Sequence, residues 1–489
     1  MKNFNPISFL AFLIVLYVAR NAVPYAAYLF ILLLLPFTLY QLVNIKEAKQ
    51  SFVRSVKIFF PVIVLIFIEL GALFATVYPF KGLPLNFFKE ITSTSIFLFL
   101  LAYNIRYKND FMLLIEKIGK YFILFSIVIS LLGLWKFFYS PPIISYKYID
   151  EIRYFRWGTT LVSDYNFFSL FLLNGLAFGL HILLRSPEKI KYKTLFLVAL
   201  QLFIFTGLLS GSRRFLFCLS TLFIVCLLLL IPLLFKKIFV NKLSYKTLLL
   251  FLILSVFNFG IIYSFLSYFP LVSAKAEKIF FIDGRKTNVN IVLVSYRVNS
   301  GASFPLIKVH LPTQQAGDFK NYIYGKEDKK EIVPITSSRQ YLWVFGKKLF
   351  DEYAIIHKIF GDGFTFIKIF QKETVQYSYP HHLFLSVLLF SGIIGLIVYI
   401  AVLLWSSIIY LFHLKELGVL FFLFIMNLTF GFFSFTDFLG ASFYALLFIF
   451  PFLYHYLYKK ARKRESTKPF VLSCFRHLNY DQKNNKISV

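Results

Sequence analysis

The sequence predicts an all-α polytopic membrane protein with about twelve transmembrane helices and one large extracytoplasmic loop. Of its 489 residues, 58% are hydrophobic and only 15% are charged, which lies outside the range of soluble globular domains. Apolar runs of roughly 18 or more residues recur along nearly the whole chain, and each is long enough to cross a hydrocarbon core of about 30 Å as a helix. Lipid is therefore the expected solvent for most of the chain.

Twelve apolar segments mark the expected spans. A hydropathy window of about 19 residues places them at 7–19, 22–43, 58–78, 91–105, 119–139, 165–184, 194–209, 214–235, 247–269, 383–411, 417–434 and 438–457. The first segment is short and Gly207 interrupts the seventh, so a re-entrant or tilted segment is the alternative at both places.

The lysines and arginines that follow the spans occupy every second connection. They are Lys46, Lys49, Arg54 and Lys57; Arg106 and Lys108; Arg185, Lys189, Lys191 and Lys193; Lys236, Lys237, Lys242 and Lys246; and Lys459, Lys460, Arg462, Lys463 and Arg464. Because cytoplasmic connections carry an excess of Lys and Arg, both termini are expected in the cytoplasm, with 140–164, 210–213, 270–382 and 435–437 outside. Topology thus accounts for the formal net charge of +29, and no nucleic-acid partner is expected.

The expected spans divide the chain into five parts. These are transmembrane helices 1–5 at 1–139, helices 6–9 at 140–269, the large loop at 270–382, helices 10–12 at 383–457 and a basic cytoplasmic tail at 458–489. In the first half of the loop, alternation at 290–297 and 306–311 around a turn at 299–302 predicts a small β hairpin.

The second half of the loop is expected to be helical from Arg339 onward. Leu342, Phe345 and Leu349 fall on one face of that helix, and the lysines Lys347 and Lys348 fall off it. We expect this amphipathic helix to lie along the membrane surface.

Four polar clusters fall at the extracytoplasmic face, and the first ends in Ser212, Arg213 and Arg214. The two arginines open an apolar helix on the side that should be poor in cations. A guanidinium binds phosphate oxygens through its planar fork, so a phosphate site is one interpretation. The alternative is an arginine that reaches back to the lipid headgroups.

The second cluster, Pro380-His381-His382, opens the tenth span. Proline suits the first turn of a helix, and the positive end of the helix dipole favours a neutral imidazole that can act as a general base. An interfacial histidine without a chemical task is the alternative.

The third and fourth clusters combine charged and aromatic residues. Arg339 stands four residues before Trp343, which indicates either a binding site or a solvated charge over an aromatic anchor. At the start of the sixth span, Asp164 and Asn166 are suited to cap the helix. The segment Gly361-Asp-Gly363 is interpreted as a turn only.

Several kinds of chemistry are not indicated. The sequence has no Walker-type glycine loop, no HExxH, no GxSxG and no pair of carboxylates within a span, and Cys218, Cys226 and Cys474 lack the spacing of a metal site. No metal or cofactor is therefore expected. Glu69 lies inside the third span, where it is either part of a proton path or a partnered structural carboxylate.

Taken in order, these segments resemble the O-antigen ligase and O-antigen polymerase superfamily of bacterial membrane glycosyltransferases. The matching motifs are Ser163-Asp-Tyr-Asn-Phe-Phe168, Thr206 to Arg214, Arg339 with Trp343, Phe360-Gly-Asp-Gly-Phe364, and His381-His-Leu-Phe-Leu385 followed by Gly392 and Gly395. The resemblance covers roughly 150–435. Tyr165 replaces a proline of the family pattern, Arg214 a glycine and His382 an asparagine, and the β-like insert has no counterpart that we can match.

The resemblance implies transfer of a glycan, with inversion and without nucleotide sugar or metal, from an undecaprenyl-pyrophosphate carrier to a hydroxyl acceptor at the periplasmic face of the inner membrane. It assigns His381 as the base, and Arg339 and Arg213 (or Arg214) as the pyrophosphate ligands. Asp164, Asn166, His382 and Trp343 would bind substrate. These are the residue types that the reaction needs, since fixed cationic donors stabilise the growing charge of the leaving group.

Four alternatives for the function remain open, one of which is a purely structural role in a surface-polysaccharide assembly complex. A ligase would use a sugar of lipid A-core as acceptor, whereas a polymerase would extend another carrier-linked repeat; the single dominant loop favours the ligase. A transferase that glycosylates proteins is a third variant of the same chemistry. A polysaccharide flippase or other transporter is the rival from a different class, although transporters keep polar groups near the bilayer midplane and often show internal repeats.

Overall fold

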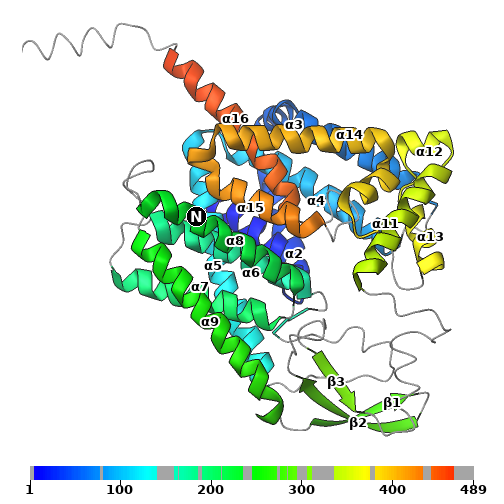
Figure 1. The fold of residues 1–489 in the computed structure, drawn as a ribbon. Helices are drawn as coiled ribbons and strands as arrows, with labels where there is room; N and C mark the ends of the chain where they lie inside the picture. The colour runs from blue at the N-terminus through cyan, green and yellow to red at the C-terminus, as the bar shows by residue number, and fades with distance from the viewer. Residues whose placement is uncertain are drawn as a thin grey trace, which may run out of the picture.

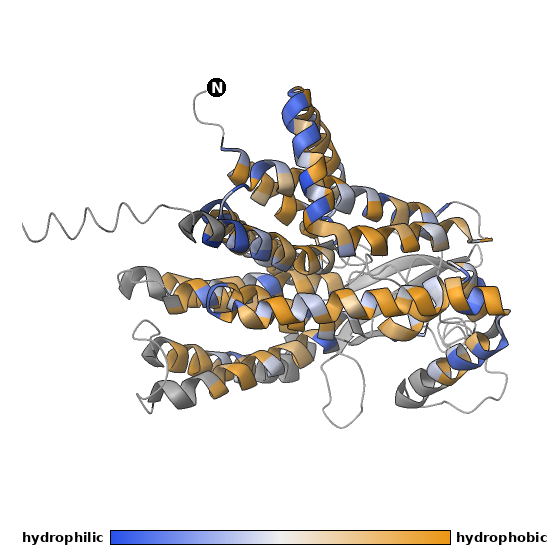
Figure 2. Cartoon of the chain, turned by 90° about the horizontal axis from the view of Figure 1, so that it is seen from above, coloured by the Kyte–Doolittle hydropathy of each residue, from blue (hydrophilic) through white to orange (hydrophobic). Residues whose placement is uncertain are grey.

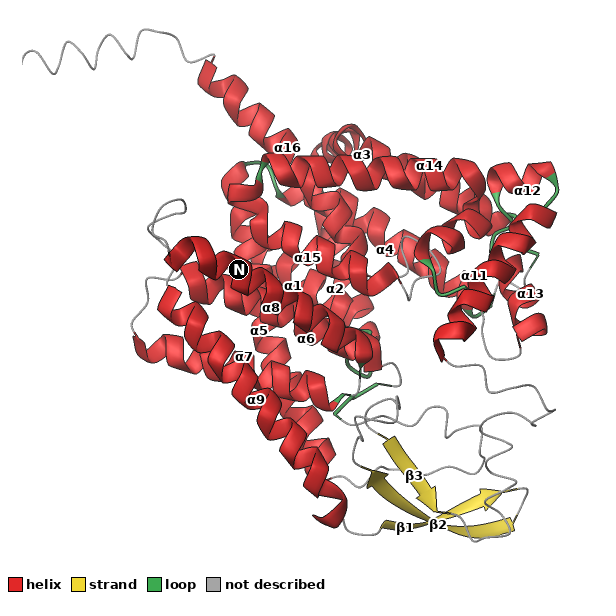
Figure 3. Cartoon of the chain, in the orientation of Figure 1, coloured by secondary structure: helices red, strands yellow, loops and turns green. Residues whose placement is uncertain are grey.

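The computed structural model consists mainly of α-helices, with one small β-sheet (Figures 1 and 3). It describes residues 5–77, 81–139, 159–162, 165–185, 190–210, 212–234, 245–272, 276–282, 285–294, 306–310, 335–374, 380–432 and 442–466. Arg213 and Arg339 are described in their helical backbone only, and Asp164 lies outside the described residues.

Each expected span overlaps one helix. These helices are α1 (Pro6–Ala19), α2 (Ala26–Leu42), α3 (Ile45–Phe74), α4 (Leu83–Asn104), α5 (Lys108–Tyr139), α6 (Tyr165–Arg185), α7 (Ile190–Leu209), α8 (Arg213–Leu234), α9 (Tyr245–Val272), α14 (Leu383–Phe412), α15 (Leu414–Phe432) and α16 (Ser442–Ser466). Within the described residues, six helices are long and apolar enough to cross a membrane, in α3, α4, α5, α6, α14 and α15. The chain therefore fits an α-helical polytopic membrane protein, and the number of twelve spans stays a prediction.

The outward faces of the helices are largely apolar (Figure 2). Phe67 on α3, Val256 on α9 and Ile397 on α14 are all more than half exposed. Such an arrangement would be unfavourable in water, whereas in lipid these side chains find a matching solvent. The exposed surface thus supports the same class of protein as the helix lengths.

The start of α3 differs from the expected span. The helix begins at Ile45 rather than 58, because its first half is amphipathic: Ala48, Ser51, Ser55 and Ile58 are buried while the lysines are exposed. A hydropathy window averages over these cations and so misses the segment. Phe59 leaves helical geometry at φ −105° and ψ 18°, next to Pro61, so α3 is kinked where the apolar part begins.

The expected interruption of the seventh span is wrong. Helix α7 continues through Gly207 to Leu209. A Cβ at Gly207 would come within 2.1–2.7 Å of the ring of Phe215 on α8, so glycine allows the two helices to approach closely there. The glycine serves packing and does not break the helix.

The loop region contains a sheet and three helices. Strands β1 (Ala276–Ile282), β2 (Arg285–Val294) and β3 (Leu306–His310) form an antiparallel sheet in the order β1-β2-β3 (Figure 3). The β2–β3 pair, with Val294 opposite Leu306, lies where the hairpin is expected. The alternation in the sequence gave no indication of β1, which pairs with β2.

The helix expected after the hairpin is present as α11 (Ile335–Glu352), which begins four residues before Arg339. Leu342 and Leu349 are buried and the two lysines are exposed, as the periodicity predicts. Helices α12 (Ile355–Phe360) and α13 (Thr365–Thr374) follow, and all three gather at one end of α14 (Figure 1). Their position on the membrane surface stays a prediction.

Candidate functional site

Helix α14 is broken at Gly392, and the segment Gly361–Gly363 fills the break. Gly392 has φ 68° and ψ −167°, which removes the normal helical partners of the carbonyl groups before it. The Asp362 N–H donates to the Leu389 carbonyl at 3.1 Å, and the Gly363 N–H donates to the Phe390 carbonyl at 3.0 Å. We call this contact the glycine junction. The segment is thus more than the simple turn that the sequence suggested.

The glycine junction leaves no room for side chains. A Cβ at Gly361 would lie 2.1 Å from the Phe390 carbonyl oxygen, and a Cβ at Gly392 would lie 2.4 Å from the Ile359 carbonyl oxygen. Next to the junction, the Phe364 N–H donates to Thr76 Oγ1 at 3.0 Å. The loop helices are therefore fixed by hydrogen bonds to the backbone of α14 and to the side chain of Thr76, just after α3.

The His-His motif lies just before α14. Pro380 and His381 precede the helix, and His382 is its N-cap, whose Nδ1 accepts from the Leu385 N–H at 3.3 Å. The helix starts at Leu383, where the expected tenth span starts, so Pro380 lies before the first turn and the expectation that it is part of that turn is wrong. His381 has a φ of 52°, a conformation that is uncommon for a residue with a Cβ and often found at functional sites.

Trp343 joins the same cluster from α11. Its indole ring lies edge-on to the ring of His382, with centroids 5.2 Å apart and an interplanar angle of 83°. Within the described part of the chain, the buried indole Nε1–H has no hydrogen-bond acceptor. A buried donor of this kind is unusual and suits a ligand oxygen. Arg339 stands one helical turn before Trp343 on α11.

The protonation of His382 should make the free energy of unfolding depend on pH. Burial lowers the pKa of His382 from its usual value of 6.5, and the neutral ring is the form whose Nδ1 can accept a hydrogen bond. Because the folded-state pKa lies below the unfolded-state pKa, the cap contributes fully above about pH 6.5 and is lost as the pH falls through the folded-state pKa.

We therefore expect the melting temperature of the detergent-solubilised protein to fall below about pH 6.5. His382→Asn should lose less stability over the same range, because asparagine caps a helix without titrating. The measurement is thermal unfolding of both proteins as a function of pH. The same pH dependence in both would show that another group titrates.

A second cluster joins the motifs at the start of α6 and α8. The Ser212 hydroxyl donates to Asn166 Oδ1 at 2.9 Å and accepts from the Phe215 N–H at 3.2 Å, so Ser212 caps α8. Ser169 and Ser210 lie hydroxyl to hydroxyl at 2.7 Å. Asn166, expected as a helix cap, instead connects the two motifs.

The two adjacent arginines occupy different positions on α8. The Arg214 guanidinium lies 5.6 Å from the centroid of the Phe430 ring on α15, in a cation–π contact. Arg213 is the first residue of the helix. Since neighbouring residues on a helix are about 100° apart, the two positions lie on different faces. Arg214 therefore packs against α15, and the assignment of Arg213 as an anion ligand stays a prediction.

Helix α15 packs against α14, α6 and α8. Asn427 Nδ2 donates to Asn174 Oδ1 on α6 at 2.9 Å, and Phe424 contacts the ring of Tyr410 on α14 at 5.4 Å. In this way α15 packs between the helix that follows the histidines and the helices that carry Asn166 and Arg214. The contact of α15 with Tyr410 lies near the opposite end of α14 from His382, so the shared face of the polar motifs stays a prediction.

A buried charged network escaped the sequence analysis. Arg20 at the end of α1 forms an ion pair with Glu90 on α4, and Glu90 Oε2 accepts from the Tyr17 hydroxyl at 2.6 Å. Glu69 on α3 is also fully buried. Arg20 and Glu90 are far apart in sequence, so the only available signal was a charge at the edge of each apolar run.

The comparisons with known proteins return no match: neither a protein-family model, nor a curated protein, nor a solved structure matches the chain. The class of protein is therefore described from the fold and the site alone. It is a helical membrane protein with one cluster of histidines and tryptophan on α11 and α14, and a second, hydroxyl-rich cluster on α6 and α8.

Proposed function

We propose that this protein is a membrane glycosyltransferase of the O-antigen ligase type. It moves a glycan from undecaprenyl pyrophosphate to a hydroxyl of lipid A-core at the periplasmic face of the bacterial inner membrane. In this proposal the chain crosses the membrane twelve times, both termini are cytoplasmic and residues 270–382 are periplasmic, as the distribution of cations favours.

The contact between Trp343 and His382 is the observation that carries the proposal. It joins the Arg-Trp motif of the loop to the His-His motif before α14, so two motifs that are far apart in the sequence lie in contact. The buried indole N–H supplies a donor for a sugar or phosphate oxygen. His381 directly precedes His382 in the chain and has a backbone conformation that residues with a Cβ seldom adopt.

The chemistry proposed for this cluster is a single displacement. The acceptor oxygen attacks the anomeric carbon of the donor glycan, the bond from that carbon to the pyrophosphate oxygen breaks, and its electron pair leaves with the carrier. His381 takes the proton of the attacking hydroxyl. A base placed in this way is worth roughly 10² to 10⁴ in rate.

Arg213 and Arg339 are proposed to hold the pyrophosphate. Arg213 begins α8, where the helix dipole adds to the attraction of the guanidinium for an anion. Arg339 lies one turn from Trp343, on the helix that contacts the histidine cluster. Fixed cations at the leaving group stabilise charge that grows in the transition state.

A transporter is the second candidate, and the observation that favours it is Glu69. This carboxylate is fully buried in α3, in the apolar part of the helix beyond the kink at Phe59. An ionisable residue within a span is often part of an ion or proton path. Loss of function in Glu69→Gln with full function in His381→Ala would favour the transporter.

The proposal is tested by gels of lipopolysaccharide and of carrier-linked glycan from a strain that lacks the protein, with and without the wild-type gene. A ligase predicts bare core together with long carrier-linked polymer in the deletion strain, and restoration by the gene. Core that bears single repeats would identify a polymerase instead. An unchanged pattern would contradict both.

A further inference from the structure

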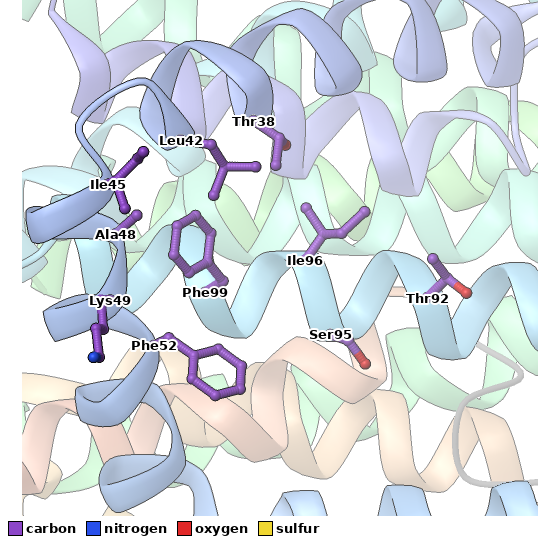
Figure 4. A pocket seen from close by; sticks show the side chains of 10 residues that line it. All are labelled: Thr38, Leu42, Ile45, Ala48, Lys49, Phe52, Thr92, Ser95, Ile96 and Phe99. Atoms are coloured by element: carbon purple, nitrogen blue, oxygen red, sulfur yellow. The ribbon is translucent and has the colours of Figure 1, made fainter.

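An open groove of about 590 Å³ lies between α2, α3 and α4, away from the histidine cluster (Figure 4). Its volume falls within the roughly 300–1,000 Å³ of typical small-ligand sites. The lining is mostly apolar, with Phe52 and Phe99 on two sides. The hydroxyls of Thr92 and Ser95 do not alter this character, because each donates to a backbone carbonyl of its own helix, at 2.8 and 2.9 Å.

The two ends of the groove differ in charge. Lys49 lines one end together with Ile45 and Ala48, and Thr92 lies at the other end (Figure 4). From Thr92 to Phe99 the α4 wall extends by about 10 Å, from the rise of 1.5 Å per residue. The groove thus has an apolar length that ends at a cation.

The charge at this end is not cancelled by the nearest acidic residue. Glu47, two residues before Lys49, forms an ion pair with Arg106 and accepts from the Tyr103 hydroxyl at 3.0 Å. Within the described ranges, no carboxylate lies within ion-pair distance of Lys49. Lys46, also exposed, adds positive charge one turn earlier on α3.

We propose that this groove binds one anionic phospholipid, with an acyl chain along α4 and the phosphate at Lys49. The apolar length of the groove matches an acyl chain, and the cation at its end matches the phosphate of the headgroup. Basic pockets between membrane helices bind anionic headgroups. A zwitterionic lipid presents the same chains without the net negative charge. On the proposed topology Lys49 faces the cytoplasm, so the lipid comes from that leaflet.

The site requires only that the protein lies in a membrane, and it is independent of glycan transfer. The test is native mass spectrometry of the purified full chain after incubation with equal amounts of phosphatidylglycerol and phosphatidylcholine that carry identical acyl chains. The wild type should retain phosphatidylglycerol about five-fold more, the factor that corresponds to ~1 kcal/mol per cation near a membrane surface.

Two variants test the two ends of the groove, each with a matched control. Lys49→Gln should reduce the preference, with Lys46 still present, whereas Lys57→Gln on the same helix, outside the groove, should keep it in full. Ser95→Phe should block the acyl chain and lower retention of both lipids. Its control is Ser220→Phe, because Ser220 is also exposed and donates to the carbonyl four residues earlier, at 2.9 Å.

Two results would overturn the proposal. Equal retention of the two lipids by the wild type would show that the headgroup is not recognised. Retention in Lys49→Gln or Ser95→Phe that matches its control would show that the lipid binds elsewhere. The elution volume in size-exclusion chromatography identifies any variant that fails to fold. If one variant fails, the other one tests the proposal.

Discussion

Replacement of His381 by alanine is expected to lower the proposed glycan transfer by roughly 10² to 10⁴, the usual contribution of a residue in the general-base role proposed for His381. His381 stands outside α14, one residue before the N-cap, and its side chain is only partly buried. The helix itself is capped by His382, so removal of the His381 imidazole should leave α14 in place. The rate of transfer by the purified protein, with a carrier-linked glycan as donor, measures the effect.

The matched control is His357→Ala. His357 lies on α12 in the same loop region, with its side chain partly exposed, and its ring contacts Asp362 at 3.5 Å. Its Nδ1 also lies 3.4 Å from the Gly361 carbonyl oxygen, but the hydrogen bonds that join the glycine junction to α14 are donated by backbone N–H groups and do not involve this side chain. Transfer should therefore persist in the control. Wild-type transfer in His381→Ala, with the same amount of inserted protein, would remove the proposed mechanism.

Helix positions could be predicted well because the apolar runs are long. The starts of α3 and α5 could not, since both helices begin in segments that carry several charges and that a hydropathy average excludes. Lys108 on α5, for example, is within ion-pair distance of Glu416 on α15, so this charged turn is part of the packed structure. Such pairing depends on distant parts of the chain.

The candidate site was partly predictable for the same reason. The distribution of cations predicted that the polar motifs share one face, which stays a prediction, and residue type indicated phosphate and proton chemistry. The sequence could not show the contacts that distinguish neighbouring residues. Arg214 differs from Arg213 by its contact with the ring of Phe430, and His382 differs from His381 because it caps α14. These differences arise from contacts between distant parts of the chain, and a single sequence does not show which helices pack against each other.

The glycine junction had no sequence signal beyond its glycines, yet it gives the largest expected effect on stability. Gly361→Ala should lower the free energy of unfolding by about 3–5 kcal/mol. The positive φ of 81° accounts for about 1–3 kcal/mol, and the loss of two backbone hydrogen bonds adds about 1 kcal/mol each. The atoms that a Cβ would meet belong to the backbone of α14, so no side chain can move aside.

Gly418→Ala on α15 is the matched control, because a Cβ at that position meets nothing within 4 Å. Alanine there should be neutral or stabilising by up to about 1 kcal/mol, since it is the better helix former. Thermal unfolding in detergent compares the two variants with the wild type. If Gly361→Ala melts with the wild type, then α12 and α13 are not held on α14 by this junction. If Gly361→Ala lowers the melting temperature, the same variant should also lose transfer. The segments before and after the junction carry Trp343 and His382, and their contact depends on the position of α11 against α14.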